Sequence, residues 1–160
     1  MCYKKLFTLF AFLSLLILGC KKSDANQDSH YMSALVNGAQ TTFSIGLFAD
    51  SVSTSSYLSY IIIGQKTAAG DELLFDLLNY NKTVLVPGTY TGTNQLNLYV
   101  SYHTAGKEYK NLALDGFTVE ITNVSNNSIS GKFHGVIKVP LNQTDSITIS
   151  NGQFYVPLLL

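Results

Sequence analysis

The sequence predicts an all-β domain, an antiparallel β-sandwich or a flattened barrel of about nine or ten strands. Apolar and polar residues alternate in several segments, and this period of two residues is the signature of a half-buried strand. The same segments are rich in β-branched residues, Tyr and Phe, and no stretch keeps a helical period. Turn residues separate the segments at spacings of about 8 to 12 residues, which is typical of sandwiches and barrels.

The first half of the pattern opens with a hairpin, because Asn37-Gly38 is a strong type I′ turn pair between two strand-like segments. Two later segments are apolar on both faces, as expected of central strands, and a turn that contains Gly70 links them. The expected strands of this half are 31–36, 41–48, 57–64, 72–80 and 96–103.

The second half predicts two more hairpins. Asn126 and Asn127 suit the first turn because asparagine tolerates left-handed backbone angles, and Asn151-Gly152 suits the second. Pro157 lacks an N–H group and fits an edge or the end of the last strand. The expected strands are 117–122, 128–139, 147–150 and 153–156.

A short apolar run stands at the start of the 160-residue chain. Lys4 and Lys5 precede the run, which covers residues 6–18, and Gly19 and Cys20 follow it. A membrane-spanning helix needs about 20 apolar residues to cross roughly 30 Å of hydrocarbon, so this run is too short for a simple anchor. It predicts an export signal instead.

The end of the run, Ile17-Leu18-Gly19-Cys20, resembles the lipobox of bacterial lipoproteins. The resemblance implies that Cys20 carries fatty acyl chains such as palmitate and becomes the mature N-terminus. Each buried methylene contributes about 0.8 kcal/mol, so more than one chain makes a lasting membrane anchor. We expect a signal peptide over 1–19, acylated Cys20 and a flexible polar tether over 20–29, and one all-β domain over 30–160.

Composition excludes some partners. After removal of residues 1–19 the chain keeps eight Lys, no Arg and ten Asp plus Glu, a formal charge of −2. Nucleic-acid binding calls for a basic stripe, which is missing, so we expect no nucleic-acid partner. Cys2 and Cys20 are the only cysteines, so the domain has no disulfide.

No motif in the sequence indicates a particular chemical reaction. His30, His103 and His134 stand alone, so we expect no metal site and no cofactor, and no serine lies in a Gly-x-Ser-x-Gly elbow. Carboxylates gather in two regions and are candidates for a glycosidase pair, although turn and edge positions explain most of them. These are Asp71, Glu72 and Asp76, and Glu108, Asp115 and Glu120. Asp76 is unusual because it stands within an apolar run.

Aromatic residues are the remaining candidates for binding. The chain has ten Tyr, nine Phe and no Trp, and sugar rings bind by stacking on aromatic faces. We predict a ligand platform from Tyr80, Tyr99, His103 and Tyr109, with cross-strand packing as the structural alternative. Asp50-Ser51-Val52 and Asp145-Ser146-Ile147 resemble O-glycosylation sites of exported Bacteroidetes-type proteins, which implies modification at Ser51 and Ser146.

The order of several short motifs resembles small Bacteroidetes-type lipoproteins of unknown function. They are Val36-Asn37-Gly38, Pro87-Gly88-Thr89-Tyr90, 117–122, 129–133 and 149–154. The resemblance implies an all-β fold and a place in the cell envelope, at the outer membrane, but no activity. We therefore expect a non-enzymatic binding or assembly module, for glycan or a protein partner. A lipocalin-like carrier of a small apolar ligand and a carboxylate-dependent hydrolase are the alternatives.

Overall fold

The computed structural model describes residues 29–68, 70–91, 98–111 and 116–159. The expected signal peptide, Cys20 and nearly all of the expected tether lie outside the described residues, as does Asp115. Among the described residues no helix is long and apolar enough to cross a membrane. The described strands are β1 (Tyr31–Val36), β2 (Ala39–Phe43), β3 (Ile45–Ser53), β4 (Leu58–Gln65), β5 (Glu72–Asn79), β6 (Gly88–Thr91), β7 (Leu98–Thr104), β8 (Lys107–Lys110), β9 (Thr118–Val124), β10 (Ser128–Val139) and β11 (Asn142–Leu159).

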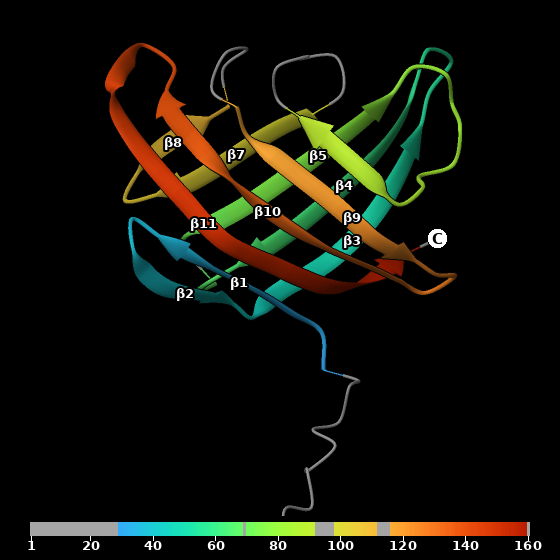
Figure 1. Ribbon diagram of the computed structural model, residues 1–160, viewed down its shortest axis with the longest axis horizontal. Helices are drawn as coiled ribbons and strands as arrows, with labels where there is room; N and C mark the ends of the chain where they lie inside the picture. Colours follow the sequence, from blue (N-terminus) through green and yellow to red (C-terminus); the bar gives the residue numbers. More distant parts are fainter. Residues whose placement is uncertain (1–28, 69, 92–97, 112–115, 160) are drawn as a thin grey trace, which may run out of the picture.

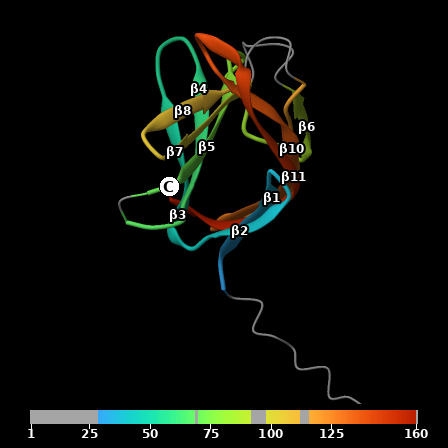
Figure 2. The same cartoon turned by 90° about the vertical axis from the view of Figure 1, so that its left-hand side faces the viewer.

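The strands form one sheet that closes on itself, so the predicted all-β fold is confirmed in the form of a flattened barrel. The order is β2-β1-β11-β3-β4-β5-β7-β8-β10-β9-β6, and β11 also pairs with β10, which completes the ring. Figure 1 shows β9, β10 and β11 crossing steeply in front of β3, β4, β5 and β7. Figure 2 shows the same two layers from the side, with β1 and β2 at one end of the core.

The expectation of a purely antiparallel sheet is wrong at one pairing. The last residues of β11, Leu158 and Leu159, pair in parallel with Ala49 and Asp50 of β3. This pairing follows from the length of β11, which runs beside β1 first and reaches β3 only at its end. The sheet is therefore mixed, and closure of the ring depends on this short contact.

The described residues form eleven strands rather than the expected nine or ten. The expected strand 41–48 divides at Ser44, whose N–H donates to the carbonyl of Gln65, because its first part pairs with β1 and its second with β4. Two short strands, β6 and β8, have too few apolar residues for a period to show.

The expected turn at Asn151-Gly152 is also wrong. Residues 147–150 and 153–156 belong to one strand, β11, and Asn151 (φ 51°) produces a bulge that shifts the register with β1 and β10. In contrast, Asn37 (φ 49°) and Gly38 (φ 81°) form the predicted left-handed hairpin turn between β1 and β2.

The hairpin between β9 and β10 is confirmed, but its asparagines do not adopt left-handed angles. Neither Asn126 nor Asn127 has a positive φ. Ser125 holds the turn instead, because its N–H donates to the carbonyl of Ser128 at 2.9 Å and its hydroxyl accepts from the N–H of Ser128 at 3.1 Å.

Phenylalanine rings fill the centre of the barrel. Phe75, Phe133 and Phe154 are buried, and the ring centroids of Phe75 and Phe133 are 4.8 Å apart. On the inner face of β10 and β11 each ring stands opposite a glycine, since Gly131 pairs with Phe154 and Gly152 pairs with Phe133. Because glycine has no side chain, the two rings occupy the space that a larger residue would fill.

Candidate binding surface

A pocket of about 280 Å³ lies at the turn end of the β7–β8 hairpin. Residues 103–108 line it together with Gly70 from the loop between β4 and β5. Ala105 (φ 49°) and Gly106 (φ 75°) form the turn, and both left-handed angles match the twist of a two-residue hairpin. The side chains at the pocket therefore stand on a short, defined turn between paired strands.

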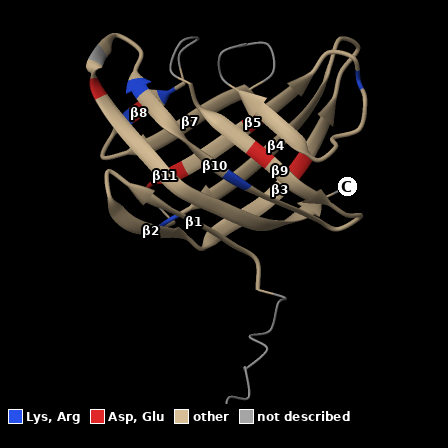
Figure 3. Cartoon of the chain, in the orientation of Figure 1, with Lys and Arg blue, Asp and Glu red and all other residues tan. Residues whose placement is uncertain are grey.

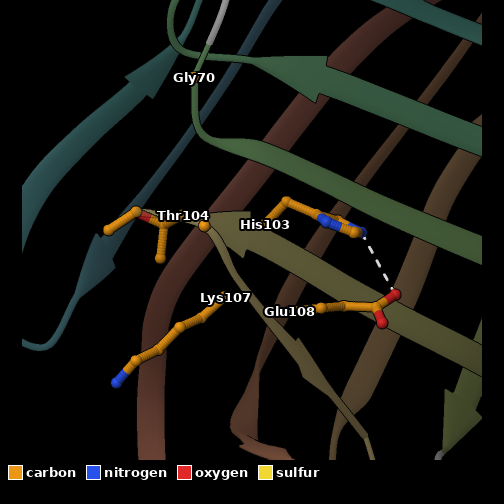
Figure 4. A pocket seen from close by; sticks show the side chains of 7 residues that line it. Gly70, His103, Thr104, Lys107 and Glu108 are labelled. Atoms are coloured by element: carbon orange, nitrogen blue, oxygen red, sulfur yellow. Dashed lines mark ion pairs between the residues drawn. The ribbon is translucent and has the colours of Figure 1, made fainter.

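On the outer face of the hairpin, Glu108 lies at the centre of a cluster, which we name the Glu108 cluster. His103 Nε2 is 3.3 Å from Glu108 Oε1, and the two side chains point toward one another across the strands (Figure 4). Lys110 Nζ is 2.7 Å from Glu108 Oε2, and the Tyr99 hydroxyl is 3.4 Å from Oε1. Lys110 also lies over the Tyr99 ring, 5.7 Å from its centroid.

Electrostatics keep Glu108 ionised. The hydrogen bond and charge of Lys110, with a smaller contribution from His103, hold the pKa of Glu108 below its usual value. The same hydrogen bond raises the pKa of Lys110. His103 remains half-exposed, with 49% of its side chain accessible, so it is the residue of this cluster that a ligand reaches most readily.

Two further clusters, each containing a lysine, an aspartate and a tyrosine, link the β7–β8 hairpin to neighbouring segments. The first is centred on Asp71. The Tyr102 and Thr104 hydroxyls donate to Asp71 at 3.1 and 2.6 Å, and Lys66 is 3.5 Å from the same carboxylate. Burial opposes ionisation of Asp71, but these hydrogen bonds and the charge of Lys66 outweigh it and lower the pKa. Burial and the charge of Asp71 raise the pKa of Tyr102 to about 12.

The second cluster is centred on Asp145 and lies where the ring of strands has its shortest pairing. β8 and β10 share one residue pair, Lys138 with Lys110. Asp145 of β11 accepts from Lys107 Nζ at 2.7 Å and from the Tyr109 hydroxyl at 3.1 Å, so two side chains of β8 are held across this gap. The bond from Lys107 lowers the pKa of Asp145.

The structure brings together only part of the predicted platform. Tyr99 and His103 share the outer face of β7, as their alternation requires. Tyr109 is buried at 7% exposure and faces the interior beside Tyr102. Tyr80 follows the opposite end of β5, where it meets Tyr57. One face of Tyr99 is already covered by Lys110, so His103 and Tyr80 are the accessible members.

The other singled-out residues are dispersed. His30 stacks on Tyr155 at 5.1 Å, and His134 is exposed on β10. In the part of the chain that the structure describes, no three His, Cys, Asp or Glu side chains are grouped to hold a metal ion. Ser146 is exposed on β11, whereas Ser51 is partly buried on β3 opposite Tyr60.

The predicted acid groups also separate. Glu72 pairs across strands with His103 and accepts from Gln65 Nε2 at 2.7 Å, while Glu120 is exposed on β9 in the other layer. Asp76 lies on the outer face of β5 opposite Ile61 and Tyr99, and its carboxylate accepts from the Ser59 hydroxyl. Burial raises the pKa of Asp76 despite this hydrogen bond.

Three side chains of these clusters were not predicted as site residues from the sequence: Lys107, Lys110 and Asp145. A usable signal was present, because Gly106 marks a turn directly after the alternating segment that ends at His103. A return strand at 107–110 would have placed Glu108 opposite His103. Figure 3 shows acidic and basic residues interspersed, with no continuous basic stripe on the face in view.

Comparison with known proteins adds no relative. No family model matches the sequence, and no curated protein or solved structure is significantly similar to it.

Proposed function

We propose that this chain is a bacterial lipoprotein of the cell envelope, anchored to the outer membrane through acyl chains on Cys20, whose β-domain is a non-enzymatic glycan-binding module. The lipobox-like sequence supports the anchor. Eight residues, from Lys21 to Asp28, separate Cys20 from the first described residue, and a chain of that length reaches at most about 30 Å. The domain would therefore work close to the lipid surface.

The open pocket at the β7–β8 hairpin is the observation that carries the binding function. Its walls offer a half-exposed imidazole, a carboxylate and a threonine beside a short hairpin turn. Glu108 and Lys107 are each paired with an opposite charge, so the pocket carries little net charge. Sugar hydroxyls both donate and accept hydrogen bonds, and they match such mixed polar groups without requiring a charged ligand.

The electrostatics of the pocket support binding over hydrolysis. A glycosidase needs one carboxyl group whose pKa is raised, so that it can donate a proton near neutral pH. Lys110 lowers the pKa of Glu108, which makes Glu108 a poor acid. Asp76 has a raised pKa, but it lies on the outer face of β5 and does not line the pocket.

A glycan array probed with the full chain in detergent tests this function. We expect binding to one class of glycan, and at least tenfold weaker binding after His103→Ala or Glu108→Gln. His134→Ala is the matched control, because it removes another exposed histidine on the opposite layer of the barrel. A wild-type protein that binds no glycan, or equal losses in the control variant, would contradict the proposal.

A further inference from the structure

A second pocket, of about 240 Å³, lies at the other end of β5. Glu72 at one end of β5 pairs with His103, and Asn79 at the other end lines this second pocket. A strand rises about 3.4 Å per residue, so the two pockets are separated by roughly 24 Å along β5. The second pocket is bordered by the segment that connects β5 to β6, residues 80–87, which we name the crossover.

Several hydrogen bonds hold the crossover against neighbouring strands and loops. Asn79 Nδ2 donates to the carbonyl and hydroxyl of Thr83 at 3.0 and 2.7 Å. Lys82 Nζ donates to the carbonyl of Ser55 at 2.5 Å, and the N–H of Leu85 donates to the Tyr60 hydroxyl at 3.2 Å. A surface held at several points binds a ligand without a large loss of conformational entropy.

The walls of the pocket combine aromatic and amide groups. The described lining residues include Tyr80, Tyr90, Asn79, Asn81 and Thr83, and none of them is charged. Tyr80 is 48% exposed, and the Tyr57 ring meets it in a T-shaped contact with centroids 6.1 Å apart. This contact holds an accessible aromatic ring in place at the rim of the pocket.

Unused polar and apolar groups point to the class of ligand. Within the described residues, the side-chain amide of Asn81 forms no hydrogen bond. Leu78 and the exposed Tyr80 ring give the pocket an apolar surface. A ligand that satisfies both kinds of group needs an apolar face and a rim of hydroxyls, and it needs no charge. A neutral sugar ring has these properties.

We propose that the crossover pocket is a second carbohydrate subsite, in which a neutral sugar ring stacks on Tyr80 and hydrogen-bonds to Asn81. This inference rests on the proposed glycan-binding function and adds the aromatic platform that the β7–β8 pocket lacks. Because about 24 Å separates the two subsites, a single glycan chain that fills both must span that distance.

Calorimetric titration of the full chain in detergent tests the subsite. The probes are the neutral hexasaccharides of α-1,4-, β-1,4- and β-1,3-linked glucose, with polygalacturonate as the anionic comparison. We expect one neutral probe to bind, with affinity at least tenfold weaker after Tyr80→Ala and changed less than threefold after Tyr80→Phe, which keeps the ring. Tyr31→Ala is the matched control, because Tyr31 is 41% exposed on β1.

The outcomes separate this inference from the proposed function. Unchanged binding in Tyr80→Ala, with loss in His103→Ala, would overturn the subsite and leave the β7–β8 pocket standing. Loss in Tyr80→Ala with none in His103→Ala would support the subsite alone. Preference for polygalacturonate, or no binding of any neutral probe, would also overturn the subsite. Far-UV circular dichroism of Tyr80→Ala checks that an effect on binding does not come from unfolding.

Discussion

Glycines on β10 and β11 create the space for the aromatic core. A Cβ atom placed on Gly152 would lie 2.5 Å from the carbonyl oxygen of Phe133, and one on Gly131 would lie 2.6 Å from the ring of Phe154. The contact at Gly152 cannot be relieved by moving a side chain, because the carbonyl oxygen of Phe133 belongs to the backbone. The small size of these residues, rather than their backbone freedom, is what the packing requires.

Gly152→Ala is therefore expected to destabilise the domain by about 1–3 kcal/mol, the usual cost of overpacking a filled core. Urea unfolding followed by circular dichroism measures the change. Gly88→Ala is the control, because a Cβ atom there meets nothing within 4 Å, and its effect should stay within about 0.5 kcal/mol. Equal stabilities for the two variants would show that the Phe–Gly pairing does not limit the core.

Asp71 should stabilise the fold at neutral pH and lose this effect in acid. Its folded-state pKa is lowered, so its contribution is fully present above the pKa of the unfolded chain and disappears as the pH falls through the folded-state pKa. Asp71→Asn should destabilise by about 1–2 kcal/mol at pH 7, because charge-assisted bonds from Tyr102 and Thr104 weaken. Urea unfolding at pH 7 and pH 3 should show that difference shrinking; a constant difference would argue against the ionised network.

Asp76 should behave in the opposite way. Its folded-state pKa is raised, so the folded protein holds the proton more tightly, and stability is lost as the pH rises through that pKa. Asp76→Asn keeps an oxygen that accepts from Ser59 and removes the buried charge. The variant should be more stable by roughly 0.5–1 kcal/mol at pH 7 and nearly equal to wild type at pH 3. A lower melting temperature at pH 7 would contradict this reasoning.

At the scale of the strands, Asn111 extends the pairing of β7 beyond the end of β8. Its Oδ1 accepts from the N–H of Val100 at 2.7 Å, and its Nδ2 donates to the carbonyl of Leu98 at 2.9 Å. Both bonds are buried, and Asn111 itself is 7% exposed. The Asn111 side chain thus makes the two hydrogen bonds to β7 that the backbone of a neighbouring strand would otherwise make.

Replacing Asn111 by alanine leaves a buried N–H and a buried carbonyl of β7 without partners. We expect a loss of about 2–3 kcal/mol, since each unsatisfied buried group costs about 1–3 kcal/mol. Asn142→Ala, at an exposed asparagine, provides the comparison and should change stability by less than about 0.5 kcal/mol. Similar unfolding midpoints for both variants would mean that water replaces the Asn111 bonds.

The sequence predicted those elements whose signals are local. The β1–β2 hairpin was found because Asn37-Gly38 determines its own turn. The single strand β11 was missed because Asn151-Gly152 has the same local signature, and only Phe133, which is distant in sequence, explains why a glycine is needed within a strand. The short strand β8 carries charges instead of an apolar period.

The candidate sites were predictable to a smaller extent. Residue type indicated His103 and Tyr80 as candidates, but their partners come from other strands. Glu108 faces His103 only because the chain reverses at Gly106, and Tyr80 meets Tyr57 only because β4 and β5 pair. Lys107 gains its role through Asp145, which is 38 residues away in sequence. Composition does not determine such contacts between strands.

At the scale of the whole molecule, the barrel encloses a core of buried side chains. Two short pairings complete the ring, Lys110 with Lys138 and the end of β11 with β3. The β7–β8 pocket and the crossover pocket lie at opposite ends of β5, outside the phenylalanine core. This arrangement fits the proposed module, which would present ligand sites at its surface and be attached to lipid by acyl chains.

Acylation at Cys20 is the central claim, and metabolic labelling with an alkyne analogue of palmitate in a lipoprotein-producing bacterium tests it most directly. The chain has two cysteines, so Cys2→Ser is a matched control for Cys20→Ser. We predict that the wild type and Cys2→Ser incorporate the label and that Cys20→Ser does not. An unlabelled wild type, or equal labelling of Cys20→Ser, would contradict the lipid anchor.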